Sequence, residues 1–196
     1  MLQNFSNLLP YRDYSEHDVL NMYSLDTTGL GGKFVKFITG QNNPELGGGQ
    51  YSNTNVGASY AGTYSKRYEN PRKVSLATSG NTKGEVAGLM LYGTVEYSNN
   101  LQPLVLEPQL CKELGVVVSG QTTPIATAGY FRIKSDSYTN TPFPGYIGVI
   151  SDVAGKVAFV PPSTAVYASG LGVCKVLSTS GSAFGGYADV QLTIQG

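Results

Sequence analysis

The sequence contains few charged residues. Asp, Glu, Lys and Arg together make up 13% of the chain, about half of the roughly 25% found in ordinary soluble domains. Acidic and basic residues number 13 each, so the net charge at neutral pH is zero. Because no basic field is present to attract phosphate groups, we expect neither nucleic acid nor a membrane as a partner. Copies of a protein with so few charges repel one another weakly, and this favours a surface that other subunits cover.

Side chains that carry chemistry are also scarce. The chain has one histidine, His17, and two cysteines, Cys111 and Cys174, in unrelated contexts. A catalytic triad needs a base at its centre, and a zinc site needs several Cys or His ligands. The glycine-rich residues 29–33 do not form a phosphate loop, because Phe34 follows where Ser or Thr is required. We therefore predict no enzyme activity, no cofactor, no metal and no disulfide framework.

One enzymatic arrangement stays open from the sequence. Glu85, Glu96, Glu107 and Asp136 could converge in a barrel, as the paired acids of glycoside hydrolases do. No local motif supports this arrangement. We interpret the four acids as solvated or hydrogen-bonded surface residues.

Long hydrophobic runs are missing as well. The longest apolar stretches, residues 114–118 and 157–161, fall far short of the roughly 20 residues that span a bilayer. Residues 1–5 lack the basic and apolar regions of a secretory signal. We expect no transmembrane helix and synthesis in a cytoplasm.

The residues that are abundant favour β-structure. The chain has 25 Gly, 10 Pro and 14 Tyr but no Trp, which favours short strands joined by tight turns. We predict an all-β fold, with a small β-barrel or sandwich over about residues 84–196. The predicted strands are 84–97, 103–107, 114–119, 129–135, 145–151, 156–160, 171–177 and 187–194. Residues 108–114 start with Pro and are followed by Gly115, which predicts one helical turn.

The front of the chain is different. Residues 1–73 are rich in Gly, Asn and Tyr and lack a consistent apolar period, so alone they bury too little surface to offset backbone ordering. We predict an extended arm over 1–73 that contacts neighbouring subunits, followed by a β-domain over 74–196. The alternative is an ordinary loop-rich subdomain.

Three features of this arm can be predicted further. Ser15 followed by Glu16 and Asp18 resembles a helix N-terminus, so one short helix is expected there. Residues 33–38 alternate as a strand does. Tyrosine suits a contact that is partly exposed to water, because its ring is apolar and its hydroxyl is polar. The candidate interface residues are Tyr51, Tyr60, Tyr64, Tyr68, Phe34 and Phe37.

The C-terminal half contains an internal repeat at an offset of 57 residues. The matches align residues 114–116 with 171–173 (both Leu-Gly-Val), Gly129-Tyr130 with Gly186-Tyr187, and place Arg132 opposite Asp189. Residues 147–149 look like a partial third copy. We interpret each copy as a strand whose Gly permits close approach, a loop, and a returning strand. Two or three such units would close a small barrel.

These segments also resemble a known family. The phrases are 128–133 (AGYFRI), 144–149 (PGYIGV), 155–157 (GKV), 171–173 (LGV) and 186–192 (GYADVQL). Together they resemble the capsid decoration, or cement, proteins of tailed bacteriophages, over roughly residues 84–196. The long front segment departs from the compact members of that family.

The resemblance implies a structural virion protein made in the host cytoplasm and bound to the outer surface of an icosahedral head. Its implied partners are the major capsid protein and copies of itself, as a homotrimer. It implies no catalytic residues, because the function is spread over an interface. The alternatives are a head-fibre or tail-associated virion protein, and a carbohydrate-binding β module that uses exposed tyrosines.

Overall fold

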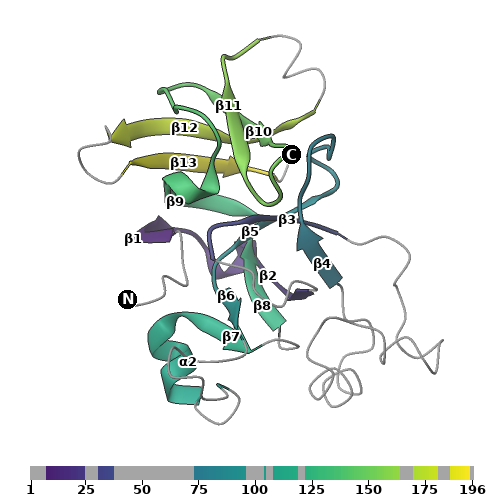
Figure 1. The fold of residues 1–196 in the computed structure, drawn as a ribbon, viewed down its shortest axis with the longest axis vertical. Coiled ribbons are helices and arrows are strands. Elements are labelled where there is room, and N and C mark those ends of the chain that lie inside the picture. The colour runs from purple at the N-terminus through teal and green to yellow at the C-terminus, as the bar shows by residue number, and fades with distance from the viewer. Residues whose placement is uncertain are drawn as a thin grey trace, which may run out of the picture.

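The computed structural model describes residues 8–24, 31–37, 73–95, 104, 108–118, 122–163, 170–180 and 186–194. Within these residues the chain is built almost wholly of β-strands, with one α-helix, so the predicted all-β class is confirmed. A six-stranded sheet lies beside a small five-stranded barrel, and a two-stranded sheet with the helix lies at the far end of the barrel (Figure 1).

The six-stranded sheet is antiparallel throughout. Its order is β1 (Leu8–Asp13), β9 (Ala128–Lys134), β13 (Tyr187–Thr193), β12 (Gly172–Ser180), β10 (Ile147–Ile150) and β11 (Val157–Val160). Side chains alternate between its faces along each strand. One face, which includes Phe131 and Ile133 of β9 and Val190 of β13, is buried against the barrel.

The barrel closes because its first and last strands pair with each other. Its order is β2 (Val19–Ser24), β4 (Lys73–Leu76), β3 (Phe34–Phe37), β5 (Val86–Met90) and β8 (Thr122–Ala126), with β2 and β8 paired. All pairings are antiparallel except that of β2 with β4. Its small interior is filled by a cluster of its own, formed by Val35, Val74, Ala87, Met90 and Ile125.

Barrel and sheet share one larger hydrophobic core. Phe34 and Leu89 of the barrel belong to the same buried cluster as Phe131, Phe159 and Val190 of the sheet. Each Val, Leu, Ile or Phe side chain in this cluster stabilises the fold by roughly 1.5–3 kcal/mol when fully removed from water. The two units are therefore joined by apolar packing rather than by a linker.

The helix ends as the sequence predicts. α2 runs over Pro108–Leu114, and Gly115 follows with φ of 62°, a left-handed conformation that glycine adopts without strain. It packs over the parallel pair β6 (Gly93–Val95) and β7 (Val116–Val118) around the buried Leu104 and Val116.

One glycine of the repeat has the role expected of it. A Cβ atom added to Gly148 of β10 would overlap the Sγ atom of Cys174 and press on the ring of Phe159. Strand β10 can therefore lie close to β12 and its inner side chains only because position 148 has no side chain.

The predicted arm is a different structure in its described parts. β1 pairs with β9, and β2 and β3 are strands of the barrel, so residues 8–24 and 31–37 are integral to both β-units. The boundary at residue 73 thus separates strands from their own partners. Pairing with distant strands supplies the hydrogen bonds and burial that these residues lack as an isolated segment.

The short helix is a single 3-10 turn over Glu16–Asp18. The Ser15 hydroxyl accepts a hydrogen bond from the His17 backbone N–H, as its expected capping role requires. Val19 then begins strand β2 instead of a second helical turn, because β8 offers an antiparallel partner over residues 19–23.

The repeat is only partly a structural one. Its closing strands, β9 and β13, are antiparallel neighbours, and the aligned positions Arg132 and Asp189 are paired in register. Its opening strands differ, since β7 pairs with β6 and β12 lies in the large sheet. The interpretation as repeated two-stranded units is therefore wrong for the first copy.

Candidate functional site

The face of the six-stranded sheet that points away from the barrel carries an ordered group of polar and aromatic side chains. We call it the outer face. The register of β9, β13 and β12 places its residues in three rows: Tyr130, Gln191 and Lys175; Arg132, Asp189 and the pair Leu177 and Ser178; Lys134, Tyr187 and Ser180.

The middle row is held by charge-assisted hydrogen bonds. Arg132 Nε lies 2.6 Å from Asp189 Oδ1, and Arg132 Nη2 lies 2.9 Å from Oδ2. The Ser178 hydroxyl donates to the same Oδ2 at 2.6 Å. The hydrogen bonds from Arg132, and then that from Ser178, lower the pKa of the Asp189 carboxyl below its ordinary value. The planar two-point contact fixes the guanidinium.

The same guanidinium lies over an aromatic ring. The Cζ atom of Arg132 is 4.1 Å from the centre of the Tyr187 ring, within the range of a cation–π contact. Arg132 therefore joins Tyr187 and Asp189 into one rigid group, which crosses from β9 to β13.

Apolar surface is exposed around this group. Tyr130 is 40% exposed and Leu177 is 43% exposed. The Tyr130 hydroxyl accepts a hydrogen bond from Gln191 Nε2 at 3.4 Å. Leu177 follows the buried Val176 and so points outward by strand alternation, and the register shift between Val176 and Ser178 places Ser178 on the same face. The outer face thus combines a fixed polar centre with accessible apolar side chains.

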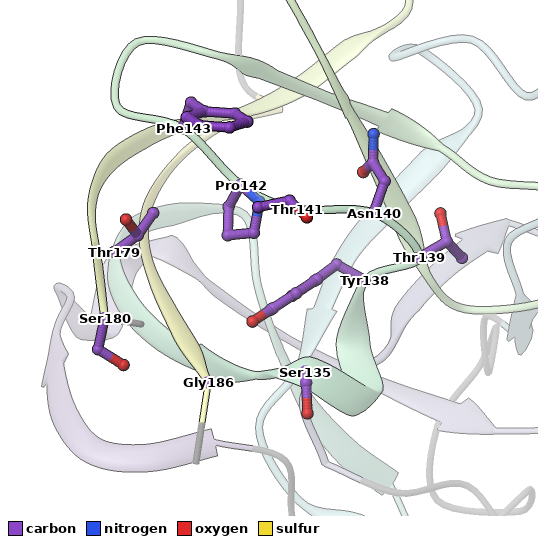
Figure 2. A pocket seen from close by; sticks show the side chains of 10 residues that line it. All are labelled: Ser135, Tyr138, Thr139, Asn140, Thr141, Pro142, Phe143, Thr179, Ser180 and Gly186. Carbon is purple, nitrogen blue, oxygen red and sulfur yellow. The ribbon is translucent and has the colours of Figure 1, made fainter. Parts of the chain in front are cut away.

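A second feature is a cavity of about 600 Å³ at the end of the sheet where β12 stops. We call it the hydroxyl pocket. Figure 2 shows the Tyr138 hydroxyl pointing toward its interior, with Ser135 on one side and Phe143 at the opposite rim. Its lining is Ser135, Tyr138, Thr139, Asn140, Thr141, Pro142, Phe143, Thr179, Ser180 and Gly186. None of these residues is ionised at neutral pH.

The wall of the pocket is built against β11. Asn140 bonds the backbone of Phe159 with both ends of its amide: Oδ1 accepts from the N–H and Nδ2 donates to the carbonyl, each at 2.6 Å. The Thr139 N–H donates to the Val157 carbonyl at 2.9 Å. Tyr138 packs its ring 5.4 Å from that of Phe159, and burial raises the pKa of the Tyr138 hydroxyl.

The predicted interface residues are not brought together in the described structure. Phe34 is fully buried in the shared core, so its ring offers nothing to a partner surface. Phe37 is half-buried and packs against the barrel cluster. Tyr51, Tyr60, Tyr64 and Tyr68 lie outside the described residues.

The groups considered for chemistry are occupied structurally or lie apart. His17 is exposed on the 3-10 turn, and burial raises the pKa of the Cys174 thiol to about 12. Glu85 accepts a hydrogen bond from the Thr82 N–H at 2.8 Å, which lowers its pKa. Glu96 and Glu107 are outside the described residues. In the part of the chain that the structure describes, no cluster of three His, Cys, Asp or Glu side chains could hold a metal ion.

The sequence analysis missed both features of the sheet. The repeat alignment places Arg132 opposite Asp189, and in the structure these two residues are paired in register and hydrogen-bonded. The alignment treats them as equivalent positions of two copies and not as residues in contact. The pocket comes from residues 135–143, which read as turn residues only.

Comparison with protein-family models and with curated protein sequences gives no significant match. Among the described residues, no helix has the length and apolar character needed to cross a bilayer.

Proposed function

We propose that this chain is a structural protein that binds other protein subunits through the outer face of its six-stranded sheet. The observation that carries this proposal is the Arg132–Asp189–Tyr187 group with Tyr130 and Leu177 exposed beside it. Tyr and Arg are the residue types that contribute most to protein interfaces. Because Arg132 is already held in place, less side-chain entropy is lost on binding.

We propose further that the subunits are those of a tailed-bacteriophage head, and that the chain is a capsid cement protein. The resemblance supports this, since its five phrases lie in or at β9, β10, β11, β12 and β13, which are neighbours in one sheet. The segments that resemble the family thus form one continuous unit. A head-fibre or tail-associated role is the alternative within the same class.

Attachment of such a protein would be strengthened by multiplicity. Contacts that are individually modest become nearly permanent when several copies in one trimer bind the same shell, because each later contact forms at high effective concentration. The low charge of the chain is compatible with a surface that ends up covered.

Two measurements test the proposal. The mass of the purified chain in solution is expected to be that of a trimer, and the chain is expected to bind emptied heads. Heads that carry it are expected to rupture at a higher temperature than heads without it. A monomer with no affinity for heads, or equal rupture temperatures, would contradict cementing, whereas label found only on tails would favour the alternative.

A variant pair tests the outer face itself. Leu177→Asp adds a negative charge on β12, next to Ser178 in the middle row, and is expected to weaken head binding at least roughly tenfold, the effect of leaving a desolvated charge in an interface. Val153→Asp is the control, because Val153 is similarly exposed, at 45%, but lies between β10 and β11. Equal loss in both variants would contradict a role for this face.

A further inference from the structure

The hydroxyl pocket is a built cavity that the proposed cementing role does not use. Its volume of about 600 Å³ lies within the range of small-molecule sites. It is formed where residues 135–143 run past the end of β12 and the start of β13. It borders the third row of the outer face at Ser180 and includes no residue of the other two rows. We infer that this pocket binds a neutral saccharide.

The chemistry of the lining selects against charged ligands. No Lys, Arg, His, Asp or Glu is among the ten lining residues. A phosphate or carboxylate would find no cation there, and a metal ion would find no carboxylate ligand. A purely apolar ligand would desolvate the hydroxyl groups without replacing their hydrogen bonds, which is costly. The ligand is therefore neutral and polar.

The hydroxyl groups match those of a sugar. Six side chains carry one: Ser135, Tyr138, Thr139, Thr141, Thr179 and Ser180. A hydroxyl both donates and accepts, so one that has no other partner can pair with a sugar hydroxyl in either sense. Two of the six are already used in part, since Thr139 donates to the Val157 carbonyl and Ser180 accepts from the Tyr187 N–H. The Ser180 proton is still available to a ligand.

An aromatic ring completes the site. Phe143 is 51% exposed and lines the rim, and its ring lies 5.2 Å from that of Tyr146, tilted by 50°. The C–H face of a sugar ring is apolar and packs on such a surface, while its hydroxyls reach the pocket wall. Figure 2 shows Phe143 at one end of the lining and the Tyr138 hydroxyl farther along it, with Pro142 and Thr141 between them. A ligand that extends past Pro142 can therefore contact both.

The wall is already ordered before any ligand arrives. The Asn140 bonds to Phe159 hold the chain beside Tyr138, and the Gly145 N–H donates to the Val176 carbonyl at 2.8 Å, which fixes the turn after Phe143. A site that is ordered in advance loses less entropy on binding.

The experiment is an NMR titration of the full chain with neutral oligosaccharides that end in glucose, galactose, mannose or N-acetylglucosamine. At least one is expected to shift the amide signals of residues 135–143 and 179–180. Phe143→Ala is expected to weaken that binding roughly tenfold and Tyr138→Phe severalfold. Tyr130→Ala, which removes an exposed aromatic ring from the outer face, is the matched control and is expected to bind as the parent does.

Other outcomes would overturn the inference. The first is that no neutral sugar shifts these signals at about 10 mM, a concentration that would detect even a millimolar ligand. The second is that Phe143→Ala and Tyr138→Phe both bind the sugar as the parent does. The third is that these residues respond only to inorganic phosphate or to a sialylated glycan. Head binding is measured separately, so failure here leaves the cementing proposal intact.

Discussion

At the scale of single residues, Lys33 shows how the junction of barrel and sheet changes a side chain. Lys33 is half-buried just before β3, and its amino group donates to the backbone carbonyl of Asp136. Burial and then the nearby charge of Lys156 lower its pKa from 10.5 to about 8, while Asp136 opposes the shift. The folded state therefore holds this proton more weakly than the unfolded chain does.

This difference predicts a stability that rises with pH. Between a pKa of about 8 in the folded state and 10.5 in the unfolded chain, the unfolded chain binds more protons, so raising the pH favours folding. Because Lys33 is half-exposed, we expect a gain of only about 1 kcal/mol. Urea unfolding at about pH 7 and pH 9.5 measures it.

The control for this prediction is a pair of lysine variants. Lys33→Met is expected to abolish the rise, whereas Lys175→Met, which changes an exposed lysine on β12, is expected to retain it. An unchanged rise in Lys33→Met would show that another group is responsible.

At the scale of elements, the outermost strand β11 is protected from pairing with another chain. Its free edge is occupied by residues 138–140, through the Tyr138–Val157 bridge and the Asn140 amide, which imitates a backbone group toward Phe159. Open strand edges promote association between chains. Asn140 therefore closes the sheet on this side.

We predict that Asn140→Asp destabilises the fold by about 1–3 kcal/mol, because a carboxylate oxygen then faces the Phe159 carbonyl and one hydrogen bond is lost. Thermal unfolding at neutral pH measures the loss, and light scattering is expected to show concentration-dependent association. Below about pH 4 a protonated Asp can donate again, so the loss should shrink.

The neighbouring exposed Thr141 provides a control for this element. Thr141→Ala is expected to change the unfolding temperature little, since exposed substitutions stay within about 0.5 kcal/mol. If Asn140→Asp were as stable as the parent at neutral pH, the amide contact would not be what protects β11.

Elements with a local signal were predicted well, and those that depend on distant partners were not. α2 follows from Pro108 and Gly115, and the predicted strands at 129–135, 145–151, 156–160, 171–177 and 187–194 match β9 to β13 within a few residues. β8 was missed because it contains Pro124, which argues against a strand. Met90 is the last residue of β5 that pairs with β8, and its partner is Ile125. Pro124 comes before Ile125 and therefore lies outside the pairing of β5 with β8.

At the scale of the whole molecule, barrel and sheet should unfold together. Phe34 of β3 is fully buried in the cluster that both units share. Phe34→Ala leaves a cavity there, and we expect it to cost about 3–5 kcal/mol. Hydrogen exchange is the measurement: protection of β12 and β13 is expected to fall as much as that of β3 and β5.

Phe143→Ala is the control, because the ring of Phe143 is mostly exposed; it is expected to leave the protection unchanged. Loss of protection confined to the barrel strands in Phe34→Ala would show that the shared core does not couple the two units.

The amino-acid sequence alone determined the β class, the helix 108–114 and the scarcity of reactive groups, because composition, glycine and proline act through local backbone geometry. Tertiary structure alone decided that the described front strands complete both β-units, that Phe34 is core, and that residues 135–143 line a pocket together with the ends of β12 and β13. Those outcomes depend on contacts between residues far apart in the chain, which local patterns do not encode.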